Sequence, residues 1–557
     1  MTVFKTPLGE EIFKRKYAST SFETWRDRSY IIVNDVCGSR DGKDDPIMHK
    51  SDMDYLTHVI CDFKFMPGGR YVNYAGRDAS YWNNCYLLRL EEDTREEWAH
   101  LTQRAMSCLM TGGGIGIDVS IARPSGRRLR RTGGVASGPI PLLYTLNEVG
   151  RNVMQGGSRR SALYGSLNWQ HEDAVDVLTA KNWHDMKIKG DIVPTDFSIS
   201  DAKKADFNFP APLDMMNVSL NYDDAFLQEL EKSKLPEIFI ANTKQAMMTG
   251  EPGFSFNFGT QENETLRNAC TEITSEDDSD VCNLGSVNMA NIETIEEFKD
   301  VVRIASKFLV CGTIRAELPY PKVLEVRQKN RRLGLGLMGM HEWLLKRGYT
   351  YEINEELKKW LKVYRDESER SANKHCDRFY LSRPKGYRAI APTGTISILA
   401  GTTSGVEPVY ATAYRRRYLT DGTKWKYQFV VDGTAESIIK STGISPDKIE
   451  SAVDLAADPE RRIKFQFELQ KYVDHAISST LNLPEWGTEL NNEDKVAGFA
   501  KIIAKYAHGL RGLTLYPNGS RGGQPITPCD YEEAHSKRGV IYEDNSDEQC
   551  LSGVCSA

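Results

Sequence analysis

Hydrophobic and polar positions follow two different periods along this chain. Short, mostly apolar runs, such as CYLLRL, IGIDVS, LYGSLNW and FSFNF, have the length and composition of buried strands. Longer amphipathic stretches predict helices, and we expect them over residues 10–17, 21–35, 94–109, 140–154, 355–379, 459–483 and 493–507. Because the strands alternate with helices, the pattern predicts an α/β fold with parallel strands.

The same pattern divides the chain into three regions. Residues 1–80 have helical spacing interrupted by turn sequences, which predicts a helical N-terminal region. Residues 81–530 carry the alternating strands and helices. Residues 531–557 are polar and acidic and follow neither period, so we expect a mobile tail.

Composition excludes several classes of protein. Of the 557 residues, 40% are hydrophobic and 27% charged, which is typical of a globular protein with an ample core. We find neither an apolar run of about 18 residues that could cross a membrane nor an N-terminal export signal. We therefore expect a cytoplasmic protein without a membrane partner. The net charge of −6 argues against general binding to nucleic acid.

Eleven cysteines without an export signal are expected to be reduced thiols, so that any disulfide would be transient. The segment NACTEI places Asn268, Cys270 and Glu272 at alternate positions. On an extended segment these three side chains would face one spot, whereas on a helix they would diverge. Taken alone, the segment also fits a surface loop with a buried cysteine.

Further cysteines stand in similarly unusual contexts. Cys282 follows in VCNLGSVNM, and Cys85 lies upstream in NNCYLL. Cys550 and Cys555 form a C-x4-C pair in the predicted tail. A mobile pair suits thiol–disulfide exchange better than a metal site with four fixed ligands, although an accidental exposed pair is the alternative. We identify no metal site. The remaining thiols are interpreted as packing residues: Cys37, Cys61, Cys108, Cys311, Cys376 and Cys529.

Three other segments suggest contacts with a nucleotide. APTGTIS (residues 391–397) offers hydroxyls and backbone N–H groups for a diphosphate, although it also fits an ordinary turn. The basic segments SGRRLRRTGG and QGGSRRSALYG suit phosphates, although such runs are usually solvated. GLGLMG (residues 334–339) matches G-x-G-x-x-G but lacks the acidic partner of a dinucleotide site, so we interpret it as structural.

These segments together resemble the large catalytic chain of ribonucleotide reductases, from about Pro67 to the C-terminus. The motifs, in the family's order, are NNCYLL, GGGIGIDVSIARPSG, TGGVASGP, QGGSRRSALYGSLNWQHED, NACTEI, CNLGSVNM, RRLGLGLMGMHEW, APTGTISILAGTTSGVEP, LTLYPNGSRGGQP and the terminal C-x4-C. The resemblance implies a ten-stranded α/β barrel made of two antiparallel halves, each of five parallel strands. A finger loop inside the barrel would carry the radical cysteine.

The resemblance also implies catalytic roles. Cys270 would form a thiyl radical that removes the ribose 3′-hydrogen, and Glu272 would accept the proton of the 3′-hydroxyl. Asn268 would hold the substrate. Cys85 and Cys282 would reduce the 2′-carbon and end as a disulfide, which requires neighbouring Cα atoms. This interpretation requires the Cys270 sulfur to lie near these two thiols and away from solvent.

Binding residues follow from the same resemblance. Cys550 and Cys555 would reduce the internal disulfide and pass electrons from a thioredoxin-like partner. Asn84 would lie near the substrate ribose, and the phosphates would contact Thr393, Gly394, Thr395 and Ile396. A deoxynucleoside triphosphate effector would be bound by Asp93, Arg123, Arg128, Arg131 and Arg159, with Glu92 as the alternative to Asp93.

The residue that follows Tyr516 indicates how the radical is generated. The enzymes that depend on a metal-containing subunit use two adjacent tyrosines here, but Pro517 follows Tyr516. We find no glycyl-radical motif either. The pattern T-x-Y-x-x-G-S-R-x-G-Q-P resembles the adenosylcobalamin-dependent class, so we expect that cofactor and no second subunit. The N-terminal region lacks signs of an ATP cone, so we expect no inhibition by dATP through such a cone.

Several alternatives stay open at this point. The chain could be a large subunit that needs a metal-radical partner, a thiol–disulfide oxidoreductase or redox sensor, or a nucleotide-binding regulator without chemistry. The substrate could be a diphosphate or a triphosphate. A homodimer is expected, with a monomer as the alternative.

Overall fold

Five parallel strands form the first half of the sheet. The computed structural model describes residues 3–39, 45–155, 161–188, 196–206, 208–420, 424–520 and 526–542. Within them the strands pair in the order β2 (Cys85–Arg89), β3 (Gly114–Asp118), β4 (Leu163–Asn168), β5 (Met216–Tyr222) and β6 (Gly253–Phe256). The crossovers carry α5 (Arg95–Met110), α6 (Pro139–Asn152), α7 (Ala174–Thr179), α8 (Ile199–Ala205), α9 (Asp224–Glu231) and α10 (Glu237–Thr249).

The second half is also parallel. Its named strands are β9 (Asp280–Asn288), β10 (Leu333–Met338), β13 (Thr480–Leu483) and β14 (Gly512–Pro517). β9 pairs with β10, and β13 pairs with β14. Residues 386–390 lie between the two pairs: the Ala389 N–H donates to the Leu335 carbonyl, and the Ile390 N–H donates to the Ala476 carbonyl. This segment is therefore the tenth strand.

The two halves join antiparallel at both edges. β2 pairs with β9 at one seam, and β6 pairs with β14 at the other. The ten strands thus close into the barrel that the family resemblance implied. The first five residues of the G-x-G-x-x-G sequence lie in the fully buried strand β10, where a Cβ at Gly336 would lie 2.8 Å from the Ala389 carbonyl oxygen. These glycines therefore serve close packing of strands.

Helices on the second half complete the barrel wall. These helices are α11 (Ile295–Arg315), α12 (Pro321–Asn330), α13 (Met340–Lys346), α14 (Glu355–Arg378), α15 (Gly394–Ala400), α16 (Gly433–Thr442), α17 (Ala452–Leu455), α18 (Pro459–Gln470) and α19 (Glu493–Ala507).

The helix predicted over residues 459–483 is longer than the observed helix α18, which ends at Gln470. Thr480–Leu483 alternates partly exposed and buried residues, which is the period of a strand, and forms β13. No helix within the described ranges is long and apolar enough to cross a membrane.

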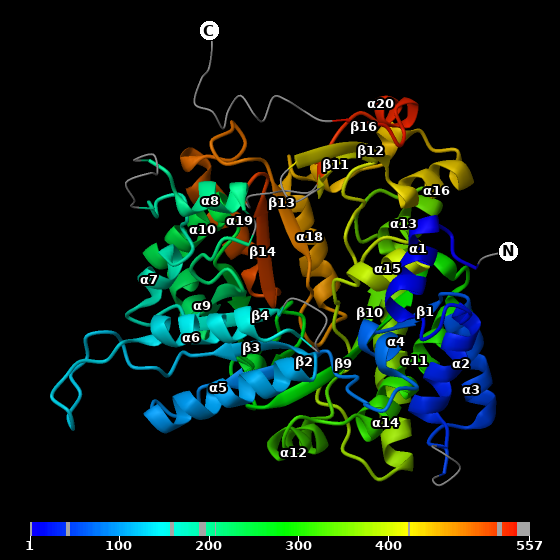
Figure 1. Cartoon of the computed structure of the whole chain (residues 1–557), viewed down its shortest axis with the longest axis horizontal. Helices are drawn as coiled ribbons and strands as arrows, with labels where there is room; N and C mark the ends of the chain where they lie inside the picture. Colours follow the sequence, from blue (N-terminus) through cyan, green and yellow to red (C-terminus); the bar gives the residue numbers. More distant parts are fainter. Residues whose placement is uncertain are drawn as a thin grey trace.

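The N-terminal region packs on the second half (Figure 1). It contains α1 (Pro7–Ile12), the π-helix η1 (Phe13–Tyr17), α2 (Trp25–Cys37), α3 (Lys50–Cys61), β1 (Phe65–Pro67) and α4 (Gly69–Tyr74). Thr24 fixes the start of α2, because its hydroxyl accepts from the Asp27 N–H while the Asp27 carboxylate accepts from the Thr24 N–H. The region is not purely helical, since β1 pairs antiparallel with β9.

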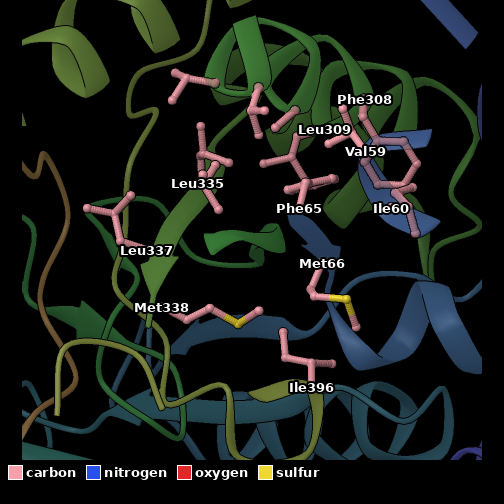
Figure 2. Packing of buried hydrophobic residues seen from close by; sticks show 14 of the residues in the cluster. Val59, Ile60, Phe65, Met66, Phe308, Leu309, Leu335, Leu337, Met338 and Ile396 are labelled. Atoms are coloured by element: carbon pink, nitrogen blue, oxygen red, sulfur yellow. The ribbon is translucent and has the colours of Figure 1, made fainter. Parts of the chain in front are cut away.

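A large apolar core joins this region to the barrel. Figure 2 shows Phe65 of β1 on the side of Leu309 of α11, and Met66 on the side of Met338 of β10. All four side chains are buried. The N-terminal region therefore shares one core with the barrel and is not a separate unit.

The C-terminal part adds a small sheet in the order β15-β11-β12-β16. Its strands are β11 (Ala413–Thr420), β12 (Lys424–Val431), β15 (Ile526–Pro528) and β16 (Ile541–Tyr542). The expectation of a tail without structure from residue 531 is wrong for its first part, because α20 (Tyr531–Ser536) buries Ala534 against this sheet. Cys550 and Cys555 lie outside the described residues.

Candidate active site

A hairpin inside the barrel carries the NACTEI segment. Its strands are β7 (Leu266–Arg267) and β8 (Thr274–Ser275), which pair antiparallel. The hairpin passes so close to β3 that a Cβ at Gly116 would lie 1.7 Å from the Arg267 carbonyl oxygen. Only glycine therefore leaves room for the hairpin at this position. Residues 266–275 form the finger loop implied by the resemblance.

Buried charged residues hold the base of the finger loop. Glu264 accepts hydrogen bonds from Arg332 at 3.1 Å, from Arg511 at 2.9 Å and from the Thr274 hydroxyl at 2.8 Å. Burial alone would raise the pKa of Glu264, but the two guanidinium groups outweigh burial and hold it well below its usual range. Glu264 is therefore an anion that ties the base of the finger loop to Arg332 and Arg511, the residues directly before β10 and β14.

Cys85 and Cys282 meet at the seam between the two halves of the barrel. They are direct partners in the antiparallel pairing of β2 with β9. Directly opposed residues in such a pair have Cα atoms about 4.5–5.5 Å apart, which lies within the range that a disulfide spans. Both thiols are free and buried, and burial raises the pKa of each well above its usual value. They are thus protonated thiols placed to form a disulfide.

The finger loop brings its amide and carboxylate to Cys85. Asn268 donates from Nδ2 to the Cys85 sulfur at 3.0 Å, while its Oδ1 accepts from the Ile273 N–H at 2.9 Å. The Cys85 thiol also lies 3.8 Å from Glu272 Oε1. Glu272 is 1% exposed, and burial raises its pKa to about 7. Its Oε2 has no hydrogen-bond partner, so one carboxylate oxygen is left to accept a proton.

Cys270 lies at the turn of the finger loop and is exposed, so the expectation that it is shielded from solvent is wrong. Thr271 beside it has a φ of 70°, in the left-handed region, where the chain reverses between β7 and β8. Cys270 was also expected to lie near Cys85 and Cys282. It interacts electrostatically with Cys85, which agrees with the first half of this expectation. Ala269 and Glu272 are buried on either side. The Cys270 thiol at the tip is thus accessible, whereas these two flanking residues are not.

The segment predicted to bind phosphates follows the tenth strand directly. Thr393 precedes α15 with a φ of 52°, and its hydroxyl accepts from the Gly405 N–H at 2.7 Å. A helix leaves its first N–H groups without internal partners, and here these belong to Gly394, Thr395 and Ile396. Ala389 and Ala391 belong to the same small buried cluster as the two seam cysteines, so this segment lies beside them.

Two neighbouring polar groups could contact a substrate. The Asn84 side-chain oxygen is buried without a hydrogen-bond partner, and Asn84 directly precedes Cys85. Lys16 of the N-terminal region reaches the Thr395 hydroxyl at 3.4 Å. Sequence reasoning missed Lys16, because nothing in its local pattern relates it to a segment so distant along the chain.

The residues predicted to bind an effector are only partly brought together. Asp93 accepts from the Arg123 backbone N–H at 3.1 Å and pairs with its guanidinium group. Asp93 and Arg123, two of the residues predicted to bind the effector, thus lie in direct contact. Arg128 and Arg131 are exposed on the arm that projects between β3 and α6 (Figure 1). Arg159 lies outside the described residues.

A cavity of about 1290 Å³ lies beside α15. Its lining comes from the N-terminal segment, the ends of β13 and β14, and the small C-terminal sheet, and it includes Ser397, Ser404, Asn482 and Tyr516. Small-molecule pockets usually measure about 300–1,000 Å³, so this cavity has room for an unusually large ligand.

Comparisons with known proteins agree with this geometry. The family described as "Ribonucleotide reductase, barrel domain" matches residues 83–364 and 383–516, which is more than half of the chain. The chain is 26% identical to the vitamin B12-dependent ribonucleoside-diphosphate reductase of Mycobacterium tuberculosis, covering 84% of this chain and 72% of that one. It is 25% identical to a putative adenosylcobalamin-dependent ribonucleoside-triphosphate reductase of Mycobacterium phage D29, covering 90% and 80%.

A solved structure shares the fold. The alpha subunit of the class Id ribonucleotide reductase of Actinobacillus ureae superposes with a TM-score of 0.68 over 92% of this chain and 97% of that one, at 17% identity. The barrel, the inner finger loop with its cysteine, and the thiol pair at the seam occur together with the family match. This chain therefore belongs to the ribonucleotide reductase family.

Proposed function

We propose that this chain reduces ribonucleotides to 2′-deoxyribonucleotides with a thiyl radical on Cys270. The observation that carries the proposal is the buried cluster in which Asn268 and Glu272 of the finger loop contact Cys85, directly opposite Cys282. A thiol-exchange protein would need the two cysteines but would leave the amide and the carboxylate unexplained.

Each residue then has one task. The Cys270 radical removes the 3′-hydrogen of the ribose, and Glu272 accepts the proton of the 3′-hydroxyl. A carboxylate with a pKa of about 7 suits this task, because general bases work best near the ambient pH. Asn268, whose amide donates to the Cys85 sulfur, holds the substrate. An exposed radical would react with solvent components, so the substrate itself must cover Cys270 before chemistry begins.

Reduction uses the seam thiols. The 2′-hydroxyl leaves as water, and Cys85 and Cys282 together supply two electrons and two protons to the substrate and the leaving group. The two sulfurs end as a disulfide, and Cys270 returns the hydrogen atom to the 3′-carbon of the product and becomes the thiyl radical again. We assign re-reduction of this disulfide to Cys550 and Cys555, with a thioredoxin-like protein as the external reductant.

We further propose adenosylcobalamin as the source of the radical. When bound, this cofactor would supply the radical by cleavage of its cobalt–carbon bond. The cavity beside α15 has the size for it, and residues such as Asn482 and Tyr516 would line its site. Pro517 follows Tyr516, so the tyrosine pair used with a separate metal-radical subunit is missing, which supports the cobalamin-dependent class. The need for such a subunit is the second candidate.

The proposal also covers the binding of an effector and the oligomeric state. Asp93 and Arg123 are our candidates for binding a deoxynucleoside triphosphate, together with Arg128, Arg131 and Arg159. Effector loops of this kind suit a homodimer, with a monomer as the alternative. For the substrate, the phosphate contacts are assigned to residues 393–396 and the ribose contact to Asn84.

The decisive experiment combines the purified chain, adenosylcobalamin, a dithiol and each ribonucleotide as diphosphate and as triphosphate. We expect deoxynucleotide from at least one of the two forms without a second protein. Cys270→Ala should abolish product while nucleotide binding persists, and Cys108→Ala, at a buried thiol remote from this cluster in sequence, should remain active. Product that appears only after a metal-containing subunit is added would favour the second candidate.

A further inference from the structure

Three chemically reactive side chains meet outside the candidate active site. Cys37 ends α2, Cys311 lies in α11, and His375 lies in α14. The Cys311 sulfur is 3.3 Å from His375 Nε2, and the thiols of Cys37 and Cys311 interact with each other. Both thiols are fully buried, and His375 is 4% exposed. Elements from the N-terminal region and from the barrel thus converge on one thiol pair.

Packing alone does not require this arrangement. Two sulfurs in contact with each other and with an imidazole are polar groups in a core that otherwise consists of side chains such as Phe65 and Phe308. A metal site is also not indicated, since among residues with described positions no group of three or more histidine, cysteine or acidic side chains is placed to hold a metal ion.

The two thiols differ in character. Burial opposes ionisation of Cys311, but hydrogen bonds from Cys37 and His375, together with the charges of His375 and Arg315, outweigh burial and lower its pKa. Burial raises the pKa of Cys37. A thiolate is the reactive form of cysteine, and a neighbouring thiol can resolve its oxidised product. Because His375 lies 3.3 Å from the Cys311 sulfur, we assign Cys311 as the nucleophile of the pair and Cys37 as the resolving thiol.

We propose that Cys37 and Cys311 form a peroxide-sensitive disulfide, with His375 as the proton carrier. The Cys311 thiolate attacks one oxygen of hydrogen peroxide, so that an S–O bond forms and the O–O bond breaks. The leaving hydroxide takes a proton from His375 and becomes water. Cys37 then gives its proton to His375, and its sulfur attacks Cys311. The S–O bond breaks, and the second hydroxide leaves as water with that proton.

Two thiols are thus oxidised by two electrons, and one hydrogen peroxide is reduced to two waters. Burial of both sulfurs selects a small oxidant, because a bulky disulfide reagent cannot reach them. The product joins α2 to α11 and so fastens the N-terminal region to the barrel. Tyr71 interacts electrostatically with Cys37, Cys311 and the seam residue Cys282, so the pair lies behind the wall of the candidate active site.

The test uses the full-length chain and does not depend on reductase activity. The reduced protein is treated with hydrogen peroxide, free thiols are blocked with an alkylating reagent, and a non-reducing digest is analysed by mass spectrometry. We expect a cross-linked peptide pair containing Cys37 and Cys311 that a dithiol separates again. Its absence, under conditions that oxidise Cys311 or other thiols of the chain, would overturn the proposal.

Variants then test the assigned roles. Cys37→Ser should leave Cys311 as a sulfenic acid that a dimedone probe captures. His375→Gln should slow cross-linking roughly 100-fold, in line with the loss of a positioned proton-transfer group. Cys376→Ser, a matched change at the neighbouring buried thiol, should leave cross-linking unchanged. Equal rates in the wild-type and His375→Gln proteins would refute the role of His375. The wild-type measurement decides the main proposal even where a variant does not fold.

Discussion

Cys85 and Cys282 stand directly opposite each other on antiparallel strands from the two halves of the barrel. This placement lets one disulfide span the seam without moving the backbone, because a disulfide needs Cα atoms about 4.4–6.8 Å apart. Asn268 of the finger loop contacts the same sulfur of Cys85. The seam is thus the point where the proposed radical chemistry and the proposed reduction meet.

The first prediction concerns this pair. Without any dithiol, the wild-type enzyme should form an amount of deoxynucleotide comparable to the amount of enzyme, because each oxidised pair awaits re-reduction. Product quantification with simultaneous thiol counting measures this. Cys282→Ser should form no deoxynucleotide, whereas Cys108→Ser should behave like the wild type. Sustained turnover without a dithiol would contradict the proposed electron source.

The second prediction concerns Glu272. Burial raises its pKa to about 7, so the carboxyl group is protonated in the folded protein at lower pH and cannot accept a proton. We therefore expect kcat to rise with pH and to level off above about 7. Glu272→Gln should lower kcat by about 10²–10⁴-fold and remove this pH dependence. Glu367→Gln, at another buried carboxylate, should keep the profile, and an unchanged profile in Glu272→Gln would exclude Glu272 as the base.

The third prediction concerns the space for the finger loop. Gly116→Ala would place a methyl group 1.7 Å from the Arg267 carbonyl oxygen, so the finger loop must shift. We expect a loss of about 1–3 kcal/mol in the free energy of unfolding and a loss of activity. Gly498→Ala in α19 is the control, since a Cβ there meets nothing within 4 Å and alanine favours the helix. Urea unfolding compares the two, and equal stabilities would argue against the close contact.

The fourth prediction concerns Glu264. Glu264→Gln would leave the buried Arg511 without its carboxylate partner and would weaken the hold on Arg332. We expect a loss of about 3–5 kcal/mol in the free energy of unfolding and faster amide exchange in the finger loop. The control is Glu460→Gln, which breaks an exposed pair with Lys505 and should cost less than about 1 kcal/mol. A small and equal effect of both changes would show that Glu264 does not hold the finger loop.

The sequence supports the fold far better than the contacts within the site. Strand runs such as CYLLRL become β2 because their apolar composition suits burial on both faces. Local pattern failed at residues 459–483, where a helical period passes into the alternating period of β13. The local pattern was also misleading after residue 531. There the burial of one alanine in α20 and the pairing of β16 with β12 give a polar segment regular structure.

The site shows the limit of local reasoning more clearly. The family resemblance gave the cysteines their roles, but the opposition of Cys85 and Cys282 depends on strand register, which spacing along the chain does not encode. The anionic Glu264 and its two arginines were missed for the same reason. The exposure of Cys270 was mispredicted because a role in radical chemistry suggests shielding, whereas a hairpin turn leaves its tip uncovered.

The contact between the N-terminal segment and α15 affects where a tag or label can be attached to the chain. A Cβ at Gly9 would lie 2.9 Å from the Ile398 carbonyl oxygen, and Lys16 touches Thr395. A purification tag or fluorophore at the N-terminal end would therefore lie close in sequence to residues that contact the helix assigned to the substrate phosphates, and one at the C-terminal end would lie close in sequence to the proposed electron-carrying thiols. Tyr380, which is 98% exposed in the turn after α14, is a better point of attachment for immobilisation or labelling.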